Sequence, residues 1–541
     1  MRIAISSDHA GFHLKQFLVE RLSADPQYAL HDLGTYSAEV PVDYPEYARA
    51  VAEAVARDEV ERGIVVCGSG AGACIAAGKV PGTRAFMAGD IYTAHQAVEH
   101  DDANVLCLGE RVTGPELAIE FAQAFLRAQF SDVERYRRRV GQVSASEAEQ
   151  YLPLEVLRRH GQSVWLDAIA RSMLSSGELR RLAWEERVVG VTSNPTIFEK
   201  AMGQGPEYEA PARALAEQGR SAEDIYWTLA IEDIQTAADV LRPVYQLSSA
   251  LDGYVSLECA PAVANDTPAT VEMTRDLWRR LDRPNVMIKI PATPAGVPAI
   301  EESIAAGINV NVTLMFSVAL YEQVARAYIR GLERFFSGRE SLRLGRADTL
   351  VPAPVSVASF FVSRVDTLVD TLLGGQIAAT DDPRRRERLE GLLGKAAITN
   401  ARLAYQHFKE IFAGPAWEAL VRRGAQVQRP LWASTSTKNP RYRDVRYVEE
   451  LIGPHTVNTM PPVTLSAFRD YGRVARTVDT PEALEEARET MRALADVGID
   501  MEAVTLQLQH EGVKLFAESF DQLIATLETR RQALGAASAG H

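Results

Sequence analysis

The sequence predicts an α/β protein with two domains: a doubly wound parallel sheet over residues 1–148, followed by a (β/α)8 barrel over residues 149–541. Short apolar runs rich in β-branched residues alternate with helical patterns along the chain, which is typical of parallel sheets covered by helices. The first part holds three such runs and the second part holds eight, the number of strands that closes a barrel. A polar stretch at 144–149 separates the two parts.

The first part alternates strands with helices. Strands are expected at residues 2–9, 62–67 and 104–109, with helical segments at 45–57 and 92–99. In an open sheet of this kind, ligands bind at the carboxyl ends of the strands. The second strand runs into a glycine-rich turn, whose backbone amides can approach an anion or an oxyanion closely. By itself this turn fits a dinucleotide loop or a simple tight turn equally well.

The second part contains eight strand-like runs, many of which end in a polar residue. They lie at residues 163–167, 188–195, 254–258, 285–291, 309–314, 354–361, 430–435 and 456–461. Helical patterns separate most of them, which predicts a closed parallel barrel. Polar side chains at the carboxyl ends of barrel strands point into one shared pocket. We therefore expect six residues to converge there: Asp167, Asn194, Glu258, Lys289, Asn311 and Thr313.

Lys289 is the most informative residue of the predicted barrel. In the apolar run 285–291, three aliphatic side chains share one face by period two, and Lys289 lies on the other face. Burial disfavours a charged ammonium group, and a neutral amine is a nucleophile for carbonyl carbon. A lone lysine here would fit an edge strand with an exposed side chain. The carboxylates and amides at neighbouring strand ends favour Schiff-base chemistry instead.

Composition limits the classes of function. The net charge of −14 argues against nucleic-acid binding as a main role, although phosphate substrates need only local cations. No apolar run reaches 18 residues and the N-terminus is not basic and then apolar, so neither a membrane span nor a signal peptide is expected. Four cysteines without paired spacing suit a reducing cytosol. We expect a cytoplasmic protein without a metal site and without nucleic-acid or membrane partners.

Motifs in the second part resemble those of the transaldolase family. In family order they are Trp165-Leu166-Asp167, Thr192–Ile197, Ile288–Thr293 and Asn311–Ser317. The resemblance covers roughly residues 150 to 530. It implies a class I Schiff-base mechanism that moves a dihydroxyacetone unit from a ketose phosphate to an aldose phosphate, without a cofactor.

The resemblance also implies catalytic roles. Lys289 would form the imine. Glu258 and Thr313 would hold the water that shuttles protons, and Asp167 would act in the acid/base steps of carbinolamine collapse and retro-aldol cleavage. These residue types agree with the chemistry, because carboxylates near a lysine can transfer protons within hydrogen-bond reach.

Substrate-binding roles follow from the same resemblance. Asn194 and Asn311 would bind the dihydroxyacetone hydroxyls, which suits amides because each offers donors and an acceptor. Ser359 and Arg364 match the phosphate motif of the family, and the arginine fork fits phosphate geometry. Lys438 stands in an inserted stretch where the family has a second phosphate arginine, and a solvated loop lysine explains it equally well.

Motifs in the first part resemble type B ribose-5-phosphate isomerases. They are Asp8–Gly11, Asp43–Pro45, Cys67–Gly70, His100–Val105 and Arg135–Val140. The resemblance spans the whole domain and implies aldose–ketose isomerisation through a cis-enediol, without a metal or redox cofactor. The family builds its site across a dimer interface, so the resemblance also implies a homo-oligomer that dimerises through this domain.

Roles in the first part are implied in the same way. Cys67 as a thiolate would move the proton between two carbons, and His100 would open the furanose ring with the assistance of Asp8. Ser69 and the adjacent turn amides would stabilise the enediolate oxygen. A thiolate at a helix N-terminus is stabilised, although a single cysteine is more often a small buried hydrophobe. One histidine and three arginines would hold the phosphate: His9, Arg111, Arg135 and Arg139.

Two residues of the first part depart from the family. Asp101 stands where the family usually has asparagine, which places a carboxylate near a substrate hydroxyl. Ala73 stands where some relatives carry a glutamate base, which leaves Cys67 as the candidate base. The arginine run could also be a solvated helix face, although its spacing puts Arg135 and Arg139 on one side.

The two resemblances together predict a bifunctional enzyme of the non-oxidative pentose phosphate pathway that acts on sugar phosphates. One alternative is that the first domain is a non-catalytic module for sugar-phosphate binding or dimerisation, attached to an active transaldolase. Another is that the barrel is a different Schiff-base aldolase, acting on free dihydroxyacetone or other carbonyl compounds.

Overall fold

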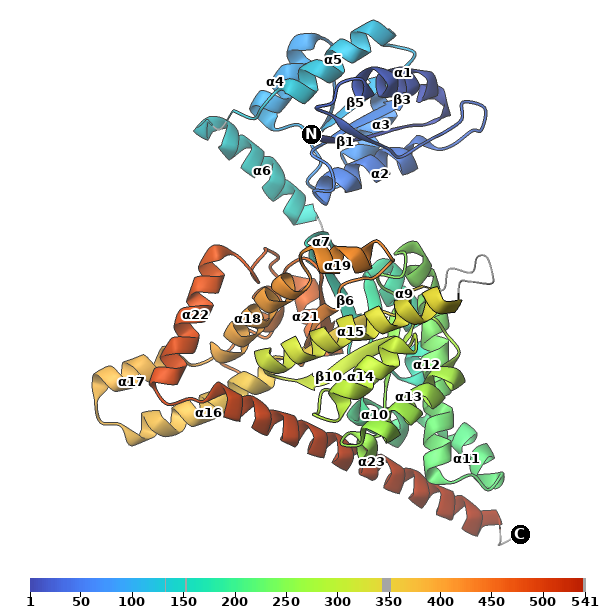
Figure 1. The fold of residues 1–541 in the computed structure, drawn as a ribbon, viewed down its shortest axis with the longest axis vertical. Coiled ribbons are helices and arrows are strands. Elements are labelled where there is room, and N and C mark those ends of the chain that lie inside the picture. The colour runs from blue at the N-terminus through green and yellow to red at the C-terminus, as the bar shows by residue number, and fades with distance from the viewer. Residues whose placement is uncertain (132, 151–152, 343–351, 539–541) are drawn as a thin grey trace. The chain divides into compact units, whose positions relative to one another are not determined.

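The chain divides into two compact units, Met1–Tyr151 and Leu152–His541. The structure, a computed structural model, describes residues 1–131, 133–150, 153–342 and 352–538 (Figure 1). Each unit has its own sheet: an open five-stranded sheet in the first and a closed barrel in the second. The predicted fold class is therefore confirmed.

The first unit contains a parallel sheet in the order β2-β1-β3-β5-β4. Its strands are β1 (Arg2–Ser7), β2 (Ala29–Asp32), β3 (Arg62–Cys67), β4 (Ala85–Met87) and β5 (Val105–Gly109). The three predicted strands are confirmed, and β2 and β4 are additional strands at the two edges. Neither contains a β-branched residue, so the sequence carried little strand signal at these positions.

Helices cover both faces of this sheet, as the doubly wound prediction requires. They are η1 (His9–Gly11), α1 (Phe12–Ser23), α2 (Tyr44–Ala56), α3 (Ala71–Ala77), α4 (Ile91–Asp101), α5 (Pro115–Arg127) and α6 (Glu134–Gln150). One apolar core joins α1, α4 and α5 to the sheet, and a second core joins α2 and α3 to it. The predicted polar stretch 144–149 is helical and lies within α6, because its alanines and glutamates are good helix formers.

The second unit contains the barrel, in which each strand pairs in parallel with the next and the last pairs with the first. The strands are β6 (Gln162–Leu166), β7 (Val188–Val191), β8 (Tyr254–Glu258), β9 (Val286–Pro291), β10 (Val310–Met315), β11 (Ser356–Phe361), β12 (Arg429–Ala433) and β13 (Thr456–Met460). All eight predicted strands are confirmed. β7 ends before the predicted boundary at 195, because Asn194 caps a helix that opens with Pro195.

Helices surround the barrel and connect its strands. They are α7 (Pro153–Arg159), α8 (Arg171–Ser175), α9 (Glu178–Glu185), α10 (Pro195–Gln204), η2 (Pro206–Tyr208), α11 (Glu209–Glu217), α12 (Ala222–Leu247), η3 (Pro261–Val263), α13 (Thr267–Leu281), α14 (Gly296–Ala305), α15 (Val318–Leu342), α16 (Ser363–Ala379), α17 (Pro383–Glu390), α18 (Ala396–Ile411), α19 (Pro415–Val421), α20 (Arg446–Glu449), α21 (Pro462–Tyr471), α22 (Pro481–Asp496) and α23 (Met501–Ser538).

The C-terminal helix α23 runs along the lower side of the barrel unit in Figure 1 and contacts β10 and the helices α10, α16 and η3, each of which follows a barrel strand. Gln509 of this helix donates hydrogen bonds to the carbonyl oxygens of Ala292 and Leu314, which follow β9 and end β10. Thr196 at the start of α10 is hydrogen-bonded to Ser519 of α23 at 2.8 Å. These contacts position α23 over the end of the barrel where the predicted site lies.

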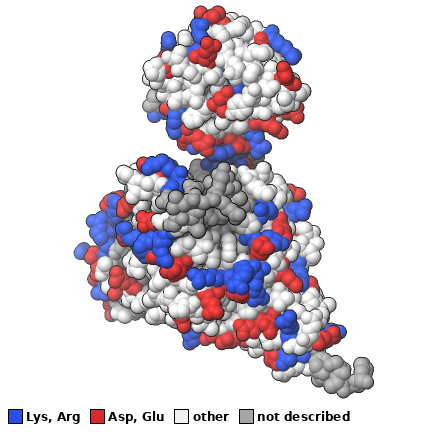
Figure 2. Space-filling view, turned by 45° about the vertical axis from the view of Figure 1, so that its right-hand side comes forward, with Lys and Arg blue, Asp and Glu red and all other residues white. Residues whose placement is uncertain are grey.

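The surface carries both signs of charge. On the face shown in Figure 2, Lys and Arg are interspersed with Asp and Glu over both units. No helix among the described residues is long and apolar enough to cross a membrane.

Candidate active sites

Lys289 lies inside the barrel near the carboxyl end of β9. Its side chain is almost fully buried, and Nζ lies 3.2 Å from Glu258 Oε2 and donates a hydrogen bond to the Ser193 carbonyl oxygen at 3.1 Å. The strand register pairs Lys289 with Glu258 on one side and with Asn311 on the other. Phe516 of α23 places its ring centre 5.7 Å from Nζ. Three polar residues from adjacent strands therefore meet at one level of the barrel, under an aromatic ring.

Two carboxyl groups interact electrostatically with the lysine. Burial raises the pKa of Glu258, and the charge of Lys289 opposes this shift. Burial also raises the pKa of Asp167, opposed by Lys289 and by a 2.7 Å hydrogen bond from Thr192 Oγ1. Each carboxyl group therefore retains a proton to higher pH than it would in water, which suits proton transfer near neutral pH.

Two buried oxygen atoms beside the lysine have no hydrogen-bond partner among the described residues: Glu258 Oε2 and Thr313 Oγ1. The contact of Glu258 with Lys289 is close enough for an ion pair but is not aligned as a hydrogen bond. Thr313 is fully buried on β10, two residues beyond Asn311 and on the same face. Because buried polar groups normally have partners, both oxygens are suited to bind a small polar molecule.

The predicted amides are already hydrogen-bonded within the protein. Asn311 donates to Ser256 Oγ at 3.0 Å and accepts a hydrogen bond from Ser359 Oγ at 2.7 Å. Asn194 accepts from the Ile197 amide at 2.9 Å and so caps α10. These bonds fix the orientation of both amides. Each of the two bonds to Asn311 uses one of its two N–H donors or one of its two acceptor sites, so a hydroxyl can still bind to the remaining N–H or lone pair.

A cavity of about 630 Å³ opens at the carboxyl end of the barrel. Six predicted site residues line it: Asp167, Asn194, Lys289, Ser359, Arg364 and Lys438. Arg364 lies in the first turn of α16, and Lys438 lies in the loop after β12. The Lys438 side chain remains exposed, yet partial burial lowers its pKa, and repulsion from Arg364 and Lys200 lowers it further. The cavity therefore gathers positively charged side chains together with Lys289.

Two elements of this cavity were not anticipated from the sequence. Lys200 of α10 lines it, and so do Leu515 and Phe516 of α23. Ile197 and Lys200 are three residues apart and follow the Asn194 cap, so helical spacing was a usable signal for Lys200. Phe516 lies more than 200 residues from Lys289 along the chain, and no local pattern could have associated the two.

Cys67 is the last residue of β3 and is buried. Its Sγ accepts a hydrogen bond from the Gly70 amide at 3.1 Å. Gly70 has φ +82°, and a Cβ there would lie 2.8 Å from Met87 Cε and 3.1 Å from the Leu108 carbonyl carbon. Only glycine fits this position, and the turn it forms directs a backbone N–H at the sulfur. Such a donor stabilises a thiolate.

Other predicted residues gather near Cys67 at the carboxyl edge of the sheet. Burial raises the pKa of Asp8, while backbone hydrogen bonds and the charges of His9 and Arg111 oppose the shift. Arg111 Cζ lies 3.5 Å from the position that a Cβ on Gly68 would occupy. Ser69 is exposed in the same turn. This edge therefore combines a thiol, backbone donors and two groups suited to bind an anion.

A second cluster contains the other predicted residues of this unit. The His100 ring stacks on Tyr136, with ring centres 4.1 Å apart and planes 16° from parallel. The Arg135 guanidinium lies 4.5 Å from the centre of the same ring. Asp101 and Arg139 are exposed on α4 and α6. The predicted ring-opening histidine and one phosphate arginine therefore meet across a tyrosine.

This second cluster lies far from Cys67 within one chain. Beyond His100 the chain returns to the amino edge of the sheet, where Arg62 at the start of β3 donates a hydrogen bond to the Ala103 carbonyl oxygen at 2.6 Å. Cys67 ends the same strand of six residues, which spans roughly 17 Å. One chain therefore does not bring Cys67 and His100 to one substrate.

Each of the two units matches a known protein family. Residues 164–527 match the family Transaldolase/Fructose-6-phosphate aldolase, and residues 3–143 match the family Ribose/Galactose Isomerase. Transaldolase 2 of Nostoc sp. (strain PCC 7120) is 46% identical over 376 residues, which covers 69% of this chain and 96% of the relative. The transaldolase of Parafrankia sp. (strain EAN1pec) is 47% identical over 386 residues, covering 71% and 99%.

Among solved structures, ribose-5-phosphate isomerase B of Clostridium thermocellum is 44% identical, covers 28% of this chain and 100% of its own, and has a TM-score of 0.27. The two family matches fall on the two parts for which the motifs predicted them. The chain therefore belongs to the transaldolase family, and its N-terminal unit adds a match to the ribose/galactose isomerases.

Proposed function

We propose that the barrel unit transfers a dihydroxyacetone unit from a ketose phosphate to an aldose phosphate through an imine on Lys289. The observation that carries this proposal is the buried Lys289 amine, 3.2 Å from Glu258 in a cavity that also holds Arg364 and Lys438. The relatives named transaldolase support the same activity.

The proposed reaction begins when Lys289 Nζ attacks the C2 carbonyl of the ketose phosphate and forms a carbinolamine. A water held by Glu258 and Thr313 delivers the proton with which the C2 hydroxyl leaves as water, and Asp167 assists this collapse to the imine. Asp167 then takes the proton of the C4 hydroxyl, the C3–C4 bond breaks, and the electron pair moves into an enamine as the aldose phosphate leaves.

The enamine then attacks the aldehyde carbon of the acceptor aldose phosphate. Asp167 returns its proton to the new C4 hydroxyl, and water hydrolyses the imine to release the new ketose phosphate. Asn194 and Asn311 hold the hydroxyls of the three-carbon unit while the first aldose leaves and the second binds. Arg364 and Lys438 bind the phosphate, and Ser359 links Asn311 to this end of the cavity.

Borohydride trapping tests this proposal. The full chain is incubated with fructose 6-phosphate, reduced, and digested, and we expect a three-carbon adduct on the peptide that contains Lys289. Transfer to an added aldose phosphate must occur in parallel. A label at another lysine, or an adduct that no aldose phosphate can accept, contradicts the proposal and favours an aldolase that acts on free carbonyl compounds.

We also propose that the first unit interconverts ribose 5-phosphate and ribulose 5-phosphate. Cys67 would carry the proton between C1 and C2, and the amides of the 68–70 turn, with Ser69, would stabilise the enediolate oxygen. The hydrogen bond from Gly70 to Cys67 Sγ supports this role. His9 and Arg111 would bind the phosphate at the same edge of the sheet, with Asp8 assisting ring opening.

The site of this isomerase would need two copies of the chain. The cluster around Tyr136, which lies away from Cys67, contains His100 and Arg135, and Arg139 follows Arg135 on α6. A second copy of the chain would therefore supply these three residues to Cys67 of the first. This proposal predicts a homodimer through the N-terminal unit. Asp101, which adjoins His100, would then face a substrate hydroxyl in the partner's site.

A second candidate function for the first unit is sugar-phosphate binding or dimerisation without catalysis. Asp101 favours it, since it stands where the family usually has asparagine. Assay of the full chain with ribose 5-phosphate separates the two functions, with Cys67→Ala as the control. Isomerase activity that disappears with Cys67→Ala supports catalysis, and the absence of any Cys67-dependent turnover supports the binding module.

The two proposed reactions act on sugar phosphates of one route, the non-oxidative pentose phosphate pathway. We propose that the protein works in the cytoplasm as a dimer with sugar-phosphate substrates. Its four free cysteines support a reducing compartment.

A further inference from the structure

The loop that carries Lys438 is fixed to α16 at its start. Ser434 Oγ lies 3.0 Å from Ser363 Oγ, and the Ser434 carbonyl oxygen accepts a hydrogen bond from the Ser363 amide at 3.2 Å. Ser434 has φ +56°, a left-handed conformation that a non-glycine residue adopts only when its surroundings impose it. The loop therefore leaves β12 in a direction that α16 imposes.

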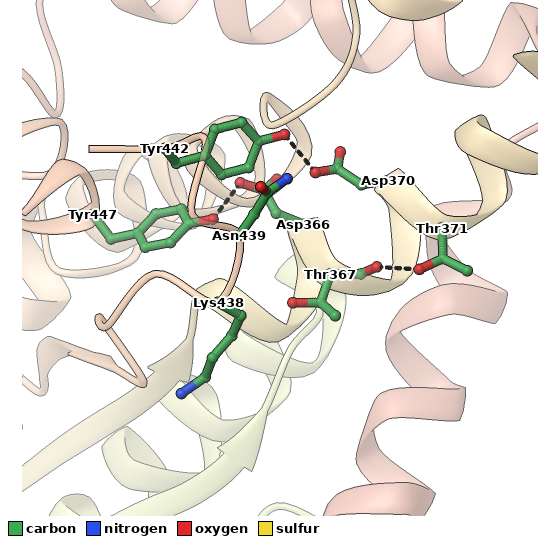
Figure 3. Close-up of a pocket in the computed structure, with 8 residues that line it drawn as sticks. All are labelled: Asp366, Thr367, Asp370, Thr371, Lys438, Asn439, Tyr442 and Tyr447. Carbon is green, nitrogen blue, oxygen red and sulfur yellow. Dashed lines mark hydrogen bonds between the residues drawn. The ribbon is translucent and has the colours of Figure 1, made fainter. Parts of the chain in front are cut away.

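The end of the loop is fixed to the same helix. Tyr442 OH donates a 2.6 Å hydrogen bond to Asp370, and Tyr447 OH donates a 2.7 Å hydrogen bond to Asp366 (Figure 3). In the same view the Lys438 side chain extends away from these two pairs. The loop is thus held on both sides of Lys438.

Both aspartates are themselves held by a second bond. The other oxygen of Asp370 accepts from the Gly394 amide at 2.8 Å, and the other oxygen of Asp366 accepts from the Ala397 amide at 2.7 Å. Gly394 has φ +69°, and a Cβ there would lie 2.6 Å from Tyr442 Cζ. Gly394 therefore packs directly on Tyr442, and the amides of Gly394 and of Ala397, in the first turn of α18, orient the two carboxylates toward the loop.

The hydrogen bonds between the loop and α16 counteract the electrostatic repulsion between Lys438 and its neighbouring cations. Lys438 stands near two other cations, Arg364 and Lys200, and repulsion from both disfavours its charged form. In the absence of a phosphate, like charges at the cavity mouth push the loop toward solvent. Its own hydrogen bond to Ser436, at 3.0 Å, lies within the loop and cannot resist a movement of the whole loop. The bonds to α16 can.

The three attachment points and the phosphate arginine belong to one helix. Ser363, Asp366 and Asp370 follow one another at intervals of three and four residues, so they share a face of α16. Arg364 lies in the first turn of the same helix. Within the described residues, Asp366 and Asp370 line a separate pocket of about 270 Å³ that shares Lys438 with the catalytic cavity.

We propose that Asp366 and Asp370 are positioning residues for phosphate recognition: through Tyr447 and Tyr442 they hold Lys438 across the cavity from Arg364, so that both cations receive the same phosphate group. This inference rests on the proposed transaldolase function. In this arrangement α16 carries Arg364 and also holds the loop that carries Lys438. One helix therefore positions both phosphate-binding cations, although they are 74 residues apart in the chain.

Tyr442→Phe and Tyr447→Phe test the proposal in the full chain, because each removes one hydroxyl group and keeps the ring. We expect the double variant to raise the KM for fructose 6-phosphate about tenfold, equivalent to about 1.4 kcal/mol, with kcat within twofold of the wild type. Tyr328→Phe is the matched control. Its hydroxyl bonds to the Gln426 and Pro354 carbonyl oxygens, at the opposite end of the barrel.

A double-mutant cycle with Lys438→Ala distinguishes positioning from general loss of structure. If the tyrosines act through Lys438, their substitution causes no further rise in KM once Lys438 is alanine. An equal rise in both backgrounds, or no rise in either, overturns the inference. Absence of transfer activity and of imine trapping in the wild type would instead overturn the proposed function, so the two failures are distinguishable.

Discussion

Cys67 ends β3 at the carboxyl end of the parallel sheet, whereas His100 lies near the amino end of the same strand, where Arg62 is hydrogen-bonded to Ala103, three residues beyond His100. The proposed isomerisation needs both groups at one substrate. A single chain therefore provides two half-sites, and a dimer in which each copy faces the other would complete two whole ones.

Complementation between inactive variants tests this arrangement. Cys67→Ala and His100→Ala should each lose isomerase activity when expressed alone. Co-expressed as mixed dimers, they should regain activity, because a heterodimer contains one site with both residues intact. Isomerase assay of the doubly tagged heterodimer provides the measurement. If the heterodimer remains as inactive as the parents, the site does not span two copies.

Substitution of Lys289, the proposed imine-forming lysine, and of its carboxylate partner Glu258 should give different results. Lys289→Met should abolish transfer and trapping, because no other amine replaces the nucleophile. Glu258→Gln should keep trapping but lower kcat by about 10²- to 10⁴-fold, the usual contribution of a proton-transfer group. Steady-state kinetics and adduct mapping measure both effects.

The pH dependence of kcat tests whether Glu258 takes part in proton transfer. Burial raises the pKa of Glu258, so its titration should appear in the kcat profile at higher pH than that of an exposed glutamate. The Glu258→Gln variant should lack this limb. A profile with the same limb in the variant would assign the titration to another group, with Asp167 the next candidate.

Lys438 and Lys200 should contribute unequally to phosphate binding. Both side chains are exposed, but Lys438 is hydrogen-bonded to Ser436 in a loop attached to α16, whereas Lys200 lies on the surface of α10. We expect Lys438→Ala to raise the KM for fructose 6-phosphate about tenfold, and Lys200→Ala about two- to threefold, because flexible exposed charges contribute little. Equal effects, or a larger one at Lys200, would reassign the second phosphate cation.

Asp366 should make the stability of the barrel unit depend on pH. Burial raises the pKa of Asp366 to about 6, above the roughly 3.9 of an unfolded chain. The folded state therefore binds the proton more tightly, and this stabilisation is fully present below about pH 4 and is lost as the pH rises through about 6. The loss amounts to roughly 2–3 kcal/mol over this window.

Asp366→Asn should remove this part of the pH dependence. Urea unfolding at pH values from 4 to 7 measures this dependence. Tryptophan fluorescence reports on the barrel unit, since all six tryptophans lie beyond residue 152. Relative to the variant, the wild type should lose stability as the pH rises from about 4 to about 6. Parallel curves for the two proteins would show that Asp366 does not retain its proton.

Much of the barrel was predictable because its signals are local. Most of the strands are short apolar runs with β-branched residues, and several of them carry or precede a polar side chain of the proposed site, so Lys289, Glu258 and Asn311 could be associated without a structure. The edge strands β2 and β4 could not be predicted, because their stability comes from pairing with β1 and β5 rather than from their own residues.

The sequence by itself determined the two α/β units, the eight strands of the barrel and which lysine, cysteine and carboxylates stand at strand ends. Only the tertiary structure decided which of them meet. It placed Phe516 over Lys289, gathered Lys200 with Lys438, and separated His100 from Cys67. The physical reason is that strand ends follow from local periodicity, whereas the contacts of a loop or of a distant helix depend on the packing of the whole unit.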